Sequence, residues 1–160
     1  CIRDSGALVE RALAGDLKDW LDDPQAWLAQ LILLDQLPRM IFRNTPRAFA
    51  GDSRARPLLQ EGLERGWDRR LTPIQRVFAY LVFEHAEDLP LQDRAVELFA
   101  DLLNEAAVDE RPLFANFLDF AERHQRVIAR FGRFPHRNAI LGRASTDEEQ
   151  AFLREPGSRF

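Results

Sequence analysis

Apolar side chains recur at intervals of three and four residues along almost the whole chain, which is the spacing of one face of an α-helix. No segment shows the sustained two-residue alternation of a half-buried strand. The pattern therefore predicts an all-α fold. Short connections favour antiparallel neighbours, and such hairpins assemble either into a bundle or into a stacked, solenoid-like array. We favour the stacked form.

The most apolar of the predicted helices begins at Pro24. Asp23 can cap it, and proline suits a first helical position because that position needs no backbone N–H. Its apolar residues cover most of its circumference, so we expect this helix to be the buried centre of the fold. Pro38 should interrupt it and leave residues 39–51 as a bend or an irregular connection.

Capping residues predict two other helix starts. Thr72 followed by Pro73 begins a helix that we expect to end near Asp88. Thr146 with Glu149 three residues later forms a capping box for a short terminal helix. The remaining helices are expected near residues 8–14, with the pattern resuming at 17–21, and near 52–65, 91–103 and 112–131.

The composition is that of a globular protein, with 160 residues, 46% hydrophobic and 30% charged. We expect residues 1–160 to form a single all-helical domain that lacks its native N-terminal segment, because Cys1 stands where an initiator Met would be. The longest apolar run, residues 31–34, is too short for a membrane helix. One cysteine cannot form an internal disulfide, which favours a cytoplasmic location. The net charge of −4 disfavours binding to nucleic acid or to anionic membranes.

The first segment with candidate chemistry follows the apolar helix. Asp35 and Gln36 lie where that helix ends, and a buried carboxylate there is costly unless donors pair with it. Arg39 and Arg43 are close enough in sequence to supply such a donor. The segment therefore predicts either a buried pair that fixes the bend or part of a ligand site.

A second segment surrounds one histidine with acids. His85 lies between Glu84 and Glu87, with Asp88 and Gln92 following. Carboxylates near a histidine can tune its pKa for acid–base catalysis or supply metal ligands. The spacing lacks the His-Glu-x-x-His arrangement of a zinc protease, and we predict a histidine beside exposed acids rather than a metal site.

The third segment is rich in arginine. Residues 123–143 contain six arginines and no acidic residue, which predicts a strongly positive field. Guanidinium groups suit carboxylates and phosphates, so this segment indicates an anion site. The alternative is that its arginines pair with acids elsewhere and only anchor the loop. Its candidate ligand-binding residues are His124, Arg130, Arg133, His136, Arg137 and Asn138.

The same segments resemble the signature stretches of the domain-of-unknown-function 924 family, which is mainly bacterial. The matching stretches are Leu33-Leu34-Asp35-Gln36, Pro38-Arg39, Phe42-Arg43, Arg47-Ala48-Phe49, His85-x-Glu87-Asp88 with Gln92, and Arg130-Phe131-Gly132-Arg133-Phe134-Pro135-His136-Arg137-Asn138. The resemblance covers nearly the whole chain. It implies an all-helical, tetratricopeptide-like fold, which is an α-solenoid or right-handed superhelix, and no established activity.

Three functions follow from these residues. The first, which we favour, is a helical binding domain whose arginines and histidines hold an anionic small molecule or an acidic peptide. The second is a small hydrolase or lyase for an anionic substrate, with a metal-assisted reaction as a variant. In it, His85 or His136 is the general base, Glu84, Glu87 or Asp88 orients it, and Arg39, Arg130 and Arg137 clamp the charge. The third is a polar network that only specifies helix packing. No cofactor motif is present in the sequence.

Overall fold

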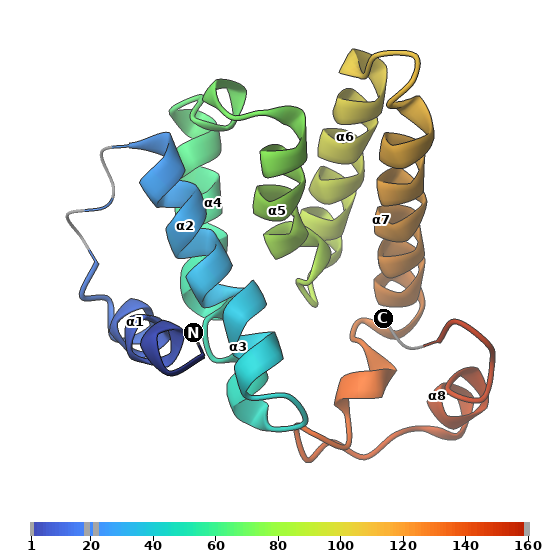
Figure 1. Ribbon diagram of the computed structural model, residues 1–160. Helices are drawn as coiled ribbons and strands as arrows, with labels where there is room; N and C mark the ends of the chain where they lie inside the picture. The colour runs from blue at the N-terminus through green and yellow to red at the C-terminus, as the bar shows by residue number, and fades with distance from the viewer. Residues whose placement is uncertain (1, 18–19, 21–22, 159–160) are drawn as a thin grey trace.

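Every regular element in the described part of the chain is helical, which confirms the all-α prediction (Figure 1). The computed structural model describes residues 2–17, 20 and 23–158, so Cys1 and the predicted helical residue Leu21 lie outside it. The elements are α1 (Ile2–Ala14), α2 (Pro24–Leu34), α3 (Gln36–Ile41), η2 (Pro46–Phe49), α4 (Asp52–Glu64), η3 (Asp68–Arg70), α5 (Pro73–Glu84), α6 (Leu89–Glu105), α7 (Arg111–Phe131), η4 (Pro135–Arg137) and α8 (Asp147–Phe152). Within the described ranges, no helix has the length and apolar content needed to cross a membrane.

Consecutive long helices run antiparallel, so α2, α5 and α7 point the same way while α4 and α6 return between them (Figure 1). The long helices α2, α4, α5, α6 and α7 each pack against the next long helix in sequence, and α2 also contacts α5, while α5 contacts α7. Gln25 at the start of α2 and Gln75 at the start of α5 exchange side-chain hydrogen bonds of 2.9 and 3.4 Å, as parallel neighbours can. The segment after α7 passes beneath the C-terminal ends of α5 and α7 (Figure 1).

The helix α2 is the buried centre, as its composition predicts. Trp27 and Leu31 on α2 are fully buried. The Trp27 indole N–H donates a 2.8 Å hydrogen bond to the carbonyl oxygen of Leu58 on α4. The Trp67 ring packs edge-on against Trp27 with 6.0 Å between ring centroids. Burial and the satisfied indole donor together fix the spacing of α2 and α4.

The expected capping residues begin their helices. Asp23 accepts a 2.9 Å hydrogen bond from the backbone N–H of Ala26 at the start of α2. Capping boxes begin α5 at Thr72 and α8 at Thr146. Gly132, with φ of 68°, ends α7 in the left-handed region that favours glycine.

Three boundaries differ from the sequence prediction. The first helix, α1, begins at Ile2 rather than near residue 8, and Leu17, where the helical pattern was expected to resume, lies outside any helix. Pro38 does not lead into an irregular connection, because a new helix, α3, begins directly after Asp35 and places Pro38 in its first turn. Backbone N–H groups in a first turn have no helical partner, so proline is tolerated there. The helix α5 ends at Glu84 rather than near Asp88. Asp88 instead caps α6, and its carboxylate accepts a 3.1 Å hydrogen bond from the backbone N–H of Leu91.

The contact between Gly62 on α4 and Trp27 gives a testable prediction. A Cβ atom at Gly62 would overlap the Trp27 indole, whereas one at Gly6 in α1 would meet nothing within 4 Å. We expect Gly62→Ala to lower the free energy of unfolding by about 1–3 kcal/mol through overpacking. Gly6→Ala should raise it by about 0.5–1 kcal/mol, because alanine is the better helix former. Urea denaturation of both variants tests this, and an equal gain in stability from both would show that α4 and α2 are not in close contact.

Candidate functional site

The three polar segments meet in one cleft of about 820 Å³, between α3, the C-terminal end of α5, α7 and the segment after α7. The charged and histidine side chains that line it are Arg39, Arg43, His85, His124, His136 and Arg137. No acidic side chain is among the lining residues. The cleft wall is therefore positively charged, although the chain as a whole carries a net charge of −4.

Behind this wall, Asp35 connects two elements of the site. Its side chain is buried at the junction of α2 and α3, 1% exposed. The carboxylate lies 2.8 and 2.9 Å from Nδ1 of His85 and 3.0 Å from Nη1 of Arg39. Burial alone would raise the pKa of Asp35, but His85 and then Arg39 outweigh it and lower the pKa to about 2. Asp35 is therefore ionised at neutral pH and accepts a hydrogen bond from His85.

This geometry defines the tautomer of His85. Because the Asp35 carboxylate can only accept, Nδ1 of His85 carries the proton between them and the neutral ring has its lone pair on Nε2. A histidine held by a carboxylate in this way is the arrangement of a general base. The orienting carboxylate is Asp35, so the sequence prediction that Glu84, Glu87 or Asp88 would orient His85 is wrong.

Arg39 links Asp35 to Asp52, the first residue of α4. Its guanidinium makes a two-pronged contact with Asp52, with distances of 2.8 and 3.0 Å, and also donates to the backbone oxygen of Asp35 at 2.9 Å. Burial would lower the pKa of Arg39, but the charges of Asp35 and Asp52 raise it. Arg39 is therefore charged and already neutralised by two acids, although it lines the cleft.

A second buried pair joins α5 to α7. Nδ1 of His124 lies 2.8 Å from the carbonyl oxygen of Phe120 and 3.1 Å from Oε1 of Glu84. Burial, reinforced by the charge of Asp35, raises the pKa of Glu84 to about 8. Burial also lowers the pKa of His124 to about 3. The Glu84–His124 contact is thus a close approach of two neutral groups at pH 7, even though its distance would suit an ion pair.

Arg137 on η4 is a buried arginine of the cleft that has no ion pair among the described residues. It is 5% exposed, and its guanidinium stacks on the rings of Phe134 and Phe49, at 4.3 and 4.8 Å from the centroids. One nitrogen donates a 3.0 Å hydrogen bond to the carbonyl oxygen of His85, and buried Nε has no partner. Burial, with the charge of Arg39, lowers the pKa of Arg137 to about 10, so it remains charged at neutral pH. Among the described residues, no carboxylate forms an ion pair with it.

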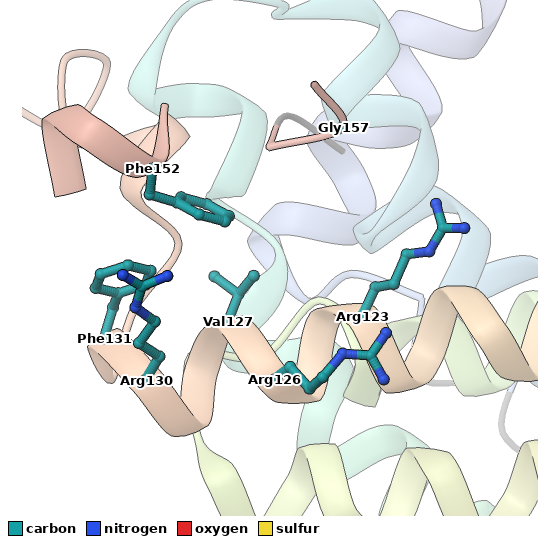
Figure 2. Close-up of a pocket in the computed structure, with 7 residues that line it drawn as sticks. All are labelled: Arg123, Arg126, Val127, Arg130, Phe131, Phe152 and Gly157. Atoms are coloured by element: carbon teal, nitrogen blue, oxygen red, sulfur yellow. The ribbon is translucent and has the colours of Figure 1, made fainter. Parts of the chain in front are cut away.

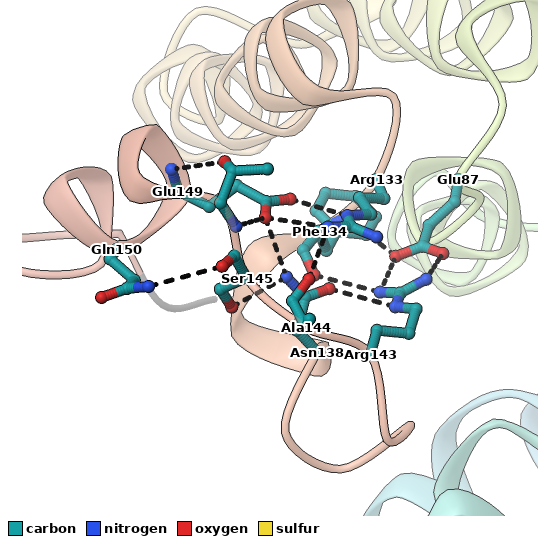
Figure 3. A network of polar contacts seen from close by, with 10 residues as sticks. Glu87, Arg133, Phe134, Asn138, Arg143, Ala144, Ser145, Glu149 and Gln150 are labelled. Atoms are coloured by element: carbon teal, nitrogen blue, oxygen red, sulfur yellow. Dashed lines mark hydrogen bonds and ion pairs between the residues drawn. The ribbon is translucent and has the colours of Figure 1, made fainter.

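Other polar residues of the third segment hold the segment in place (Figure 3). Arg143 makes a two-pronged ion pair with Glu87 at 2.6 and 2.8 Å, and Glu87 also accepts a 2.8 Å hydrogen bond from the backbone N–H of Phe134. Arg133 pairs with Glu149 at 2.6 and 2.8 Å, and the Asn138 amide donates to the same carboxylate at 3.2 Å. These contacts anchor the segment to the connection between α5 and α6 and to α8. They correspond to the structural alternative that the sequence left open, in which the arginines pair with acids.

Several of the predicted ligand-binding residues lie outside the cleft. Gln92 is fully buried and donates to the carbonyl oxygens of Glu84 and Ala86, at 2.6 and 2.7 Å, so it satisfies the end of α5. Asp88 is a helix cap. Arg130 lies on the outer face of α7 beside a separate hollow of about 190 Å³ (Figure 2). This hollow is lined by Arg123, Arg126, Val127, Arg130, Phe131, Phe152 and Gly157.

The arginines of the smaller hollow differ from Arg137 in their partners. Arg123 pairs with Asp119 at 2.6 Å, Arg126 lies 3.7 Å from Glu122, and Arg130 pairs with Glu148 at 2.9 Å. Their charges are therefore balanced by neighbouring acids. This hollow offers a weaker attraction for an anion than the cleft does.

The sequence did not identify three contributors to the cleft. Phe49 supports the guanidinium groups of Arg137 and Arg39, at 4.8 and 5.5 Å from its centroid. Phe120 lines the cleft, and Asp52 pairs with Arg39. The helical spacing of Phe120 and His124, four residues apart, is the one signal that could have found Phe120.

Glu84 gives a prediction about pH. The folded protein holds the Glu84 proton up to about pH 8, whereas the ordinary pKa of a glutamate is 4.5, so the folded state binds more protons than the unfolded state between these values. The free energy of unfolding contributed by this group therefore falls as pH rises through that window. Glu84→Gln removes this loss, so its stability relative to wild type should be greater at about pH 8 than at about pH 5.

The quantity to measure is the difference in free energy of unfolding between the variant and wild type. His124 and His136 have lowered pKa values and so titrate in the opposite sense, but both proteins contain them and their contributions cancel in this difference. The matched control is Glu64→Gln, an exposed residue on α4, whose difference from wild type should be the same at both pH values. Urea denaturation at about pH 5 and about pH 8 gives the free energy of unfolding of each variant and of wild type. A Glu84→Gln difference that does not change with pH would show that Glu84 is ionised in the folded protein.

Comparisons with known proteins agree with this all-helical architecture. A family model described as a bacterial protein of unknown function (DUF924) matches residues 1–157. The solved structure of a protein of unknown function from Agrobacterium tumefaciens is similar to this chain, with a TM-score of 0.81 and 40% sequence identity. That similarity covers 92% of this chain and 78% of the other. No match was found among the curated proteins.

Proposed function

We propose that this chain, which belongs to the DUF924 family of bacterial proteins of unknown function, is a helical binding domain whose cleft takes an anionic small molecule. The observation that supports this is Arg137, which is buried, charged and without an acidic partner among the described residues. A buried charge is costly unless it is paired. A carboxylate or phosphate in the cleft would supply the missing partner.

The surroundings of Arg137 favour an anion over a cation or a neutral ligand. Arg43 and three histidines share its wall, and the acids that could compete for Arg137 are engaged elsewhere. Asp35 and Asp52 are held by Arg39, and Glu87 is held by Arg143. Guanidinium groups bind carboxylates and phosphates through parallel hydrogen bonds, so either headgroup is suitable. An acidic peptide would present several carboxylates to the same cleft.

The proposal includes the stacked, tetratricopeptide-like arrangement and a cytoplasmic location. The shared direction of α2, α5 and α7, with α4 and α6 returning between them, supports the stacked arrangement (Figure 1). In such arrays, the helices on one face form a concave binding surface. The cleft lies at the end of these three helices. The single cysteine supports the location.

Thermal unfolding with and without ligand tests the anion site. Inorganic phosphate, succinate and citrate should each raise the melting temperature, because a ligand at 100 times its dissociation constant adds about 2.7 kcal/mol of stability. Arg137→Gln should abolish these shifts, each measured against the variant's own unliganded melting temperature. Arg130→Gln removes an arginine that lies outside the cleft, so it should leave the shifts unchanged. Equal shifts in both variants would show that the anions bind elsewhere.

A second candidate function is a small hydrolase or lyase for an anionic substrate, and the Asp35–His85 pair favours it specifically. His85 lines the cleft, and the 2.8 Å contact with Asp35 fixes the tautomer that a general base needs. The substrate's anionic group would be held by Arg137. His136, whose pKa burial lowers to about 4, is neutral and is the alternative base.

Hydrolysis of simple phosphate and carboxylate esters that carry a second anionic group tests this candidate. His85→Gln should abolish turnover, and Asp35→Asn should reduce kcat by roughly 10⁴-fold, because an amide favours the wrong tautomer of its histidine. His85→Gln should keep the phosphate-induced thermal shift, because Arg39 still pairs with Asp35 in this variant and Arg137 is unchanged. Turnover that survives His85→Gln but is lost in His136→Gln would assign the base to His136 instead.

A further inference from the structure

Two stripes of apolar side chains lead along the helices to the cleft. On α5, Ile74, Phe78, Leu81 and His85 are spaced four, three and four residues apart, so they share one face of the helix. His85 lines the cleft, which places this face on the side of the cleft. Ile74 and Phe78 are 44% and 43% exposed despite being large and apolar.

The helix α7 repeats the pattern. Leu113, Phe117, Phe120 and His124 have the same spacing of four, three and four residues. Phe120 and His124 both line the cleft, so this face also ends there. Leu113 and Phe120 are 48% and 40% exposed.

The two stripes lie on neighbouring parallel helices. Figure 1 shows α5 and α7 pointing the same way, and the two helices are in contact. Their stripes meet at the cleft, where the ring centroids of His85 and His124 are 6.3 Å apart. From Ile74 to His85 the stripe is about 16 Å long at 1.5 Å per helical residue. A partly exposed apolar track therefore runs into a positively charged cleft.

We propose that the cleft and the two stripes together bind a fatty acid anion. The carboxylate occupies the cleft at Arg137, and the alkyl chain lies along Ile74, Phe78 and Leu113. This proposal rests on the proposed function, because it uses the same anion site for the headgroup. Neighbouring exposed apolar side chains commonly mark a binding surface, and charge complementarity at one end selects a negatively charged head.

The stripes favour an alkyl chain over a peptide. A peptide backbone carries an N–H and a carbonyl at almost every residue, and each loses free energy if it is buried without a partner. The stripe positions between Ile74 and His85 on α5 and between Leu113 and His124 on α7 are all apolar, and exposed Asn116 borders the α7 stripe. An alkyl chain has no polar groups to satisfy and gains free energy from covering apolar surface.

Calorimetric titration with a series of carboxylates tests the proposal. Dodecanoate, used below its micelle concentration, should bind more tightly than octanoate, and octanoate more tightly than acetate. Dodecyl maltoside and dodecyltrimethylammonium have the same tail without the anionic head, and should bind at least tenfold more weakly than dodecanoate. Phe78→Ser should lower the affinity for dodecanoate about tenfold, as expected for losing one buried aromatic contact, and leave the affinity for phosphate unchanged.

The control variant is Val108→Ser, which removes an apolar side chain that is 86% exposed and belongs to neither stripe. It should leave dodecanoate binding unchanged. Equal affinities for acetate and dodecanoate would overturn the fatty acid proposal while leaving the anion site intact. Absence of binding by every carboxylate and by phosphate would overturn both. Dimerisation in sedimentation experiments that Phe78→Ser abolishes would assign the stripes to self-association and overturn the fatty acid proposal.

Discussion

The contacts of the buried Asp35 carboxylate are the constraint on which the cleft depends. Arg39 joins this carboxylate to Asp52 on α4, and His85 joins it to the end of α5. One side chain thus connects helices that are far apart in sequence. Removing Arg39 would leave the two carboxylates of Asp35 and Asp52 without their cation, which is strongly destabilising. Because Arg39 and His85 also line the cleft, the same contacts that stabilise the packing fix the cleft's shape.

Much of the fold could be predicted because its determinants are local. Capping at Asp23, Thr72 and Thr146 depends on residues within one helical turn, and these starts are confirmed. Pro38 was misjudged because proline breaks a helix interior but is tolerated in a first turn, and the sequence does not show that a second helix begins at Asp35. That helix start depends on tertiary contacts.

The candidate site was predictable only in part. All three histidines and three of the arginines singled out from the sequence line the cleft. Their partners were not predictable, because the His85–Asp35 contact spans 50 residues, and sequence spacing carries no information about such a pair. The acids adjacent to His85 looked like its partners, yet Glu87 holds Arg143 and Asp88 caps a helix. Only the packing of α2 against α5 brings Asp35 to His85.

The charges around the cleft divide its arginines into two roles. Arg39 faces two carboxylates, so the group of Asp35, Arg39 and Asp52 carries one excess negative charge and contributes no net attraction for an anion. Among the described residues, Arg137 makes no ion pair with these acids, although Asp52 and Asp35 act on its charge from a distance. The attraction for an anion therefore comes chiefly from Arg137, with the exposed Arg43 at the same wall. Arg39 stabilises the helix packing, and Arg137 is left for the ligand.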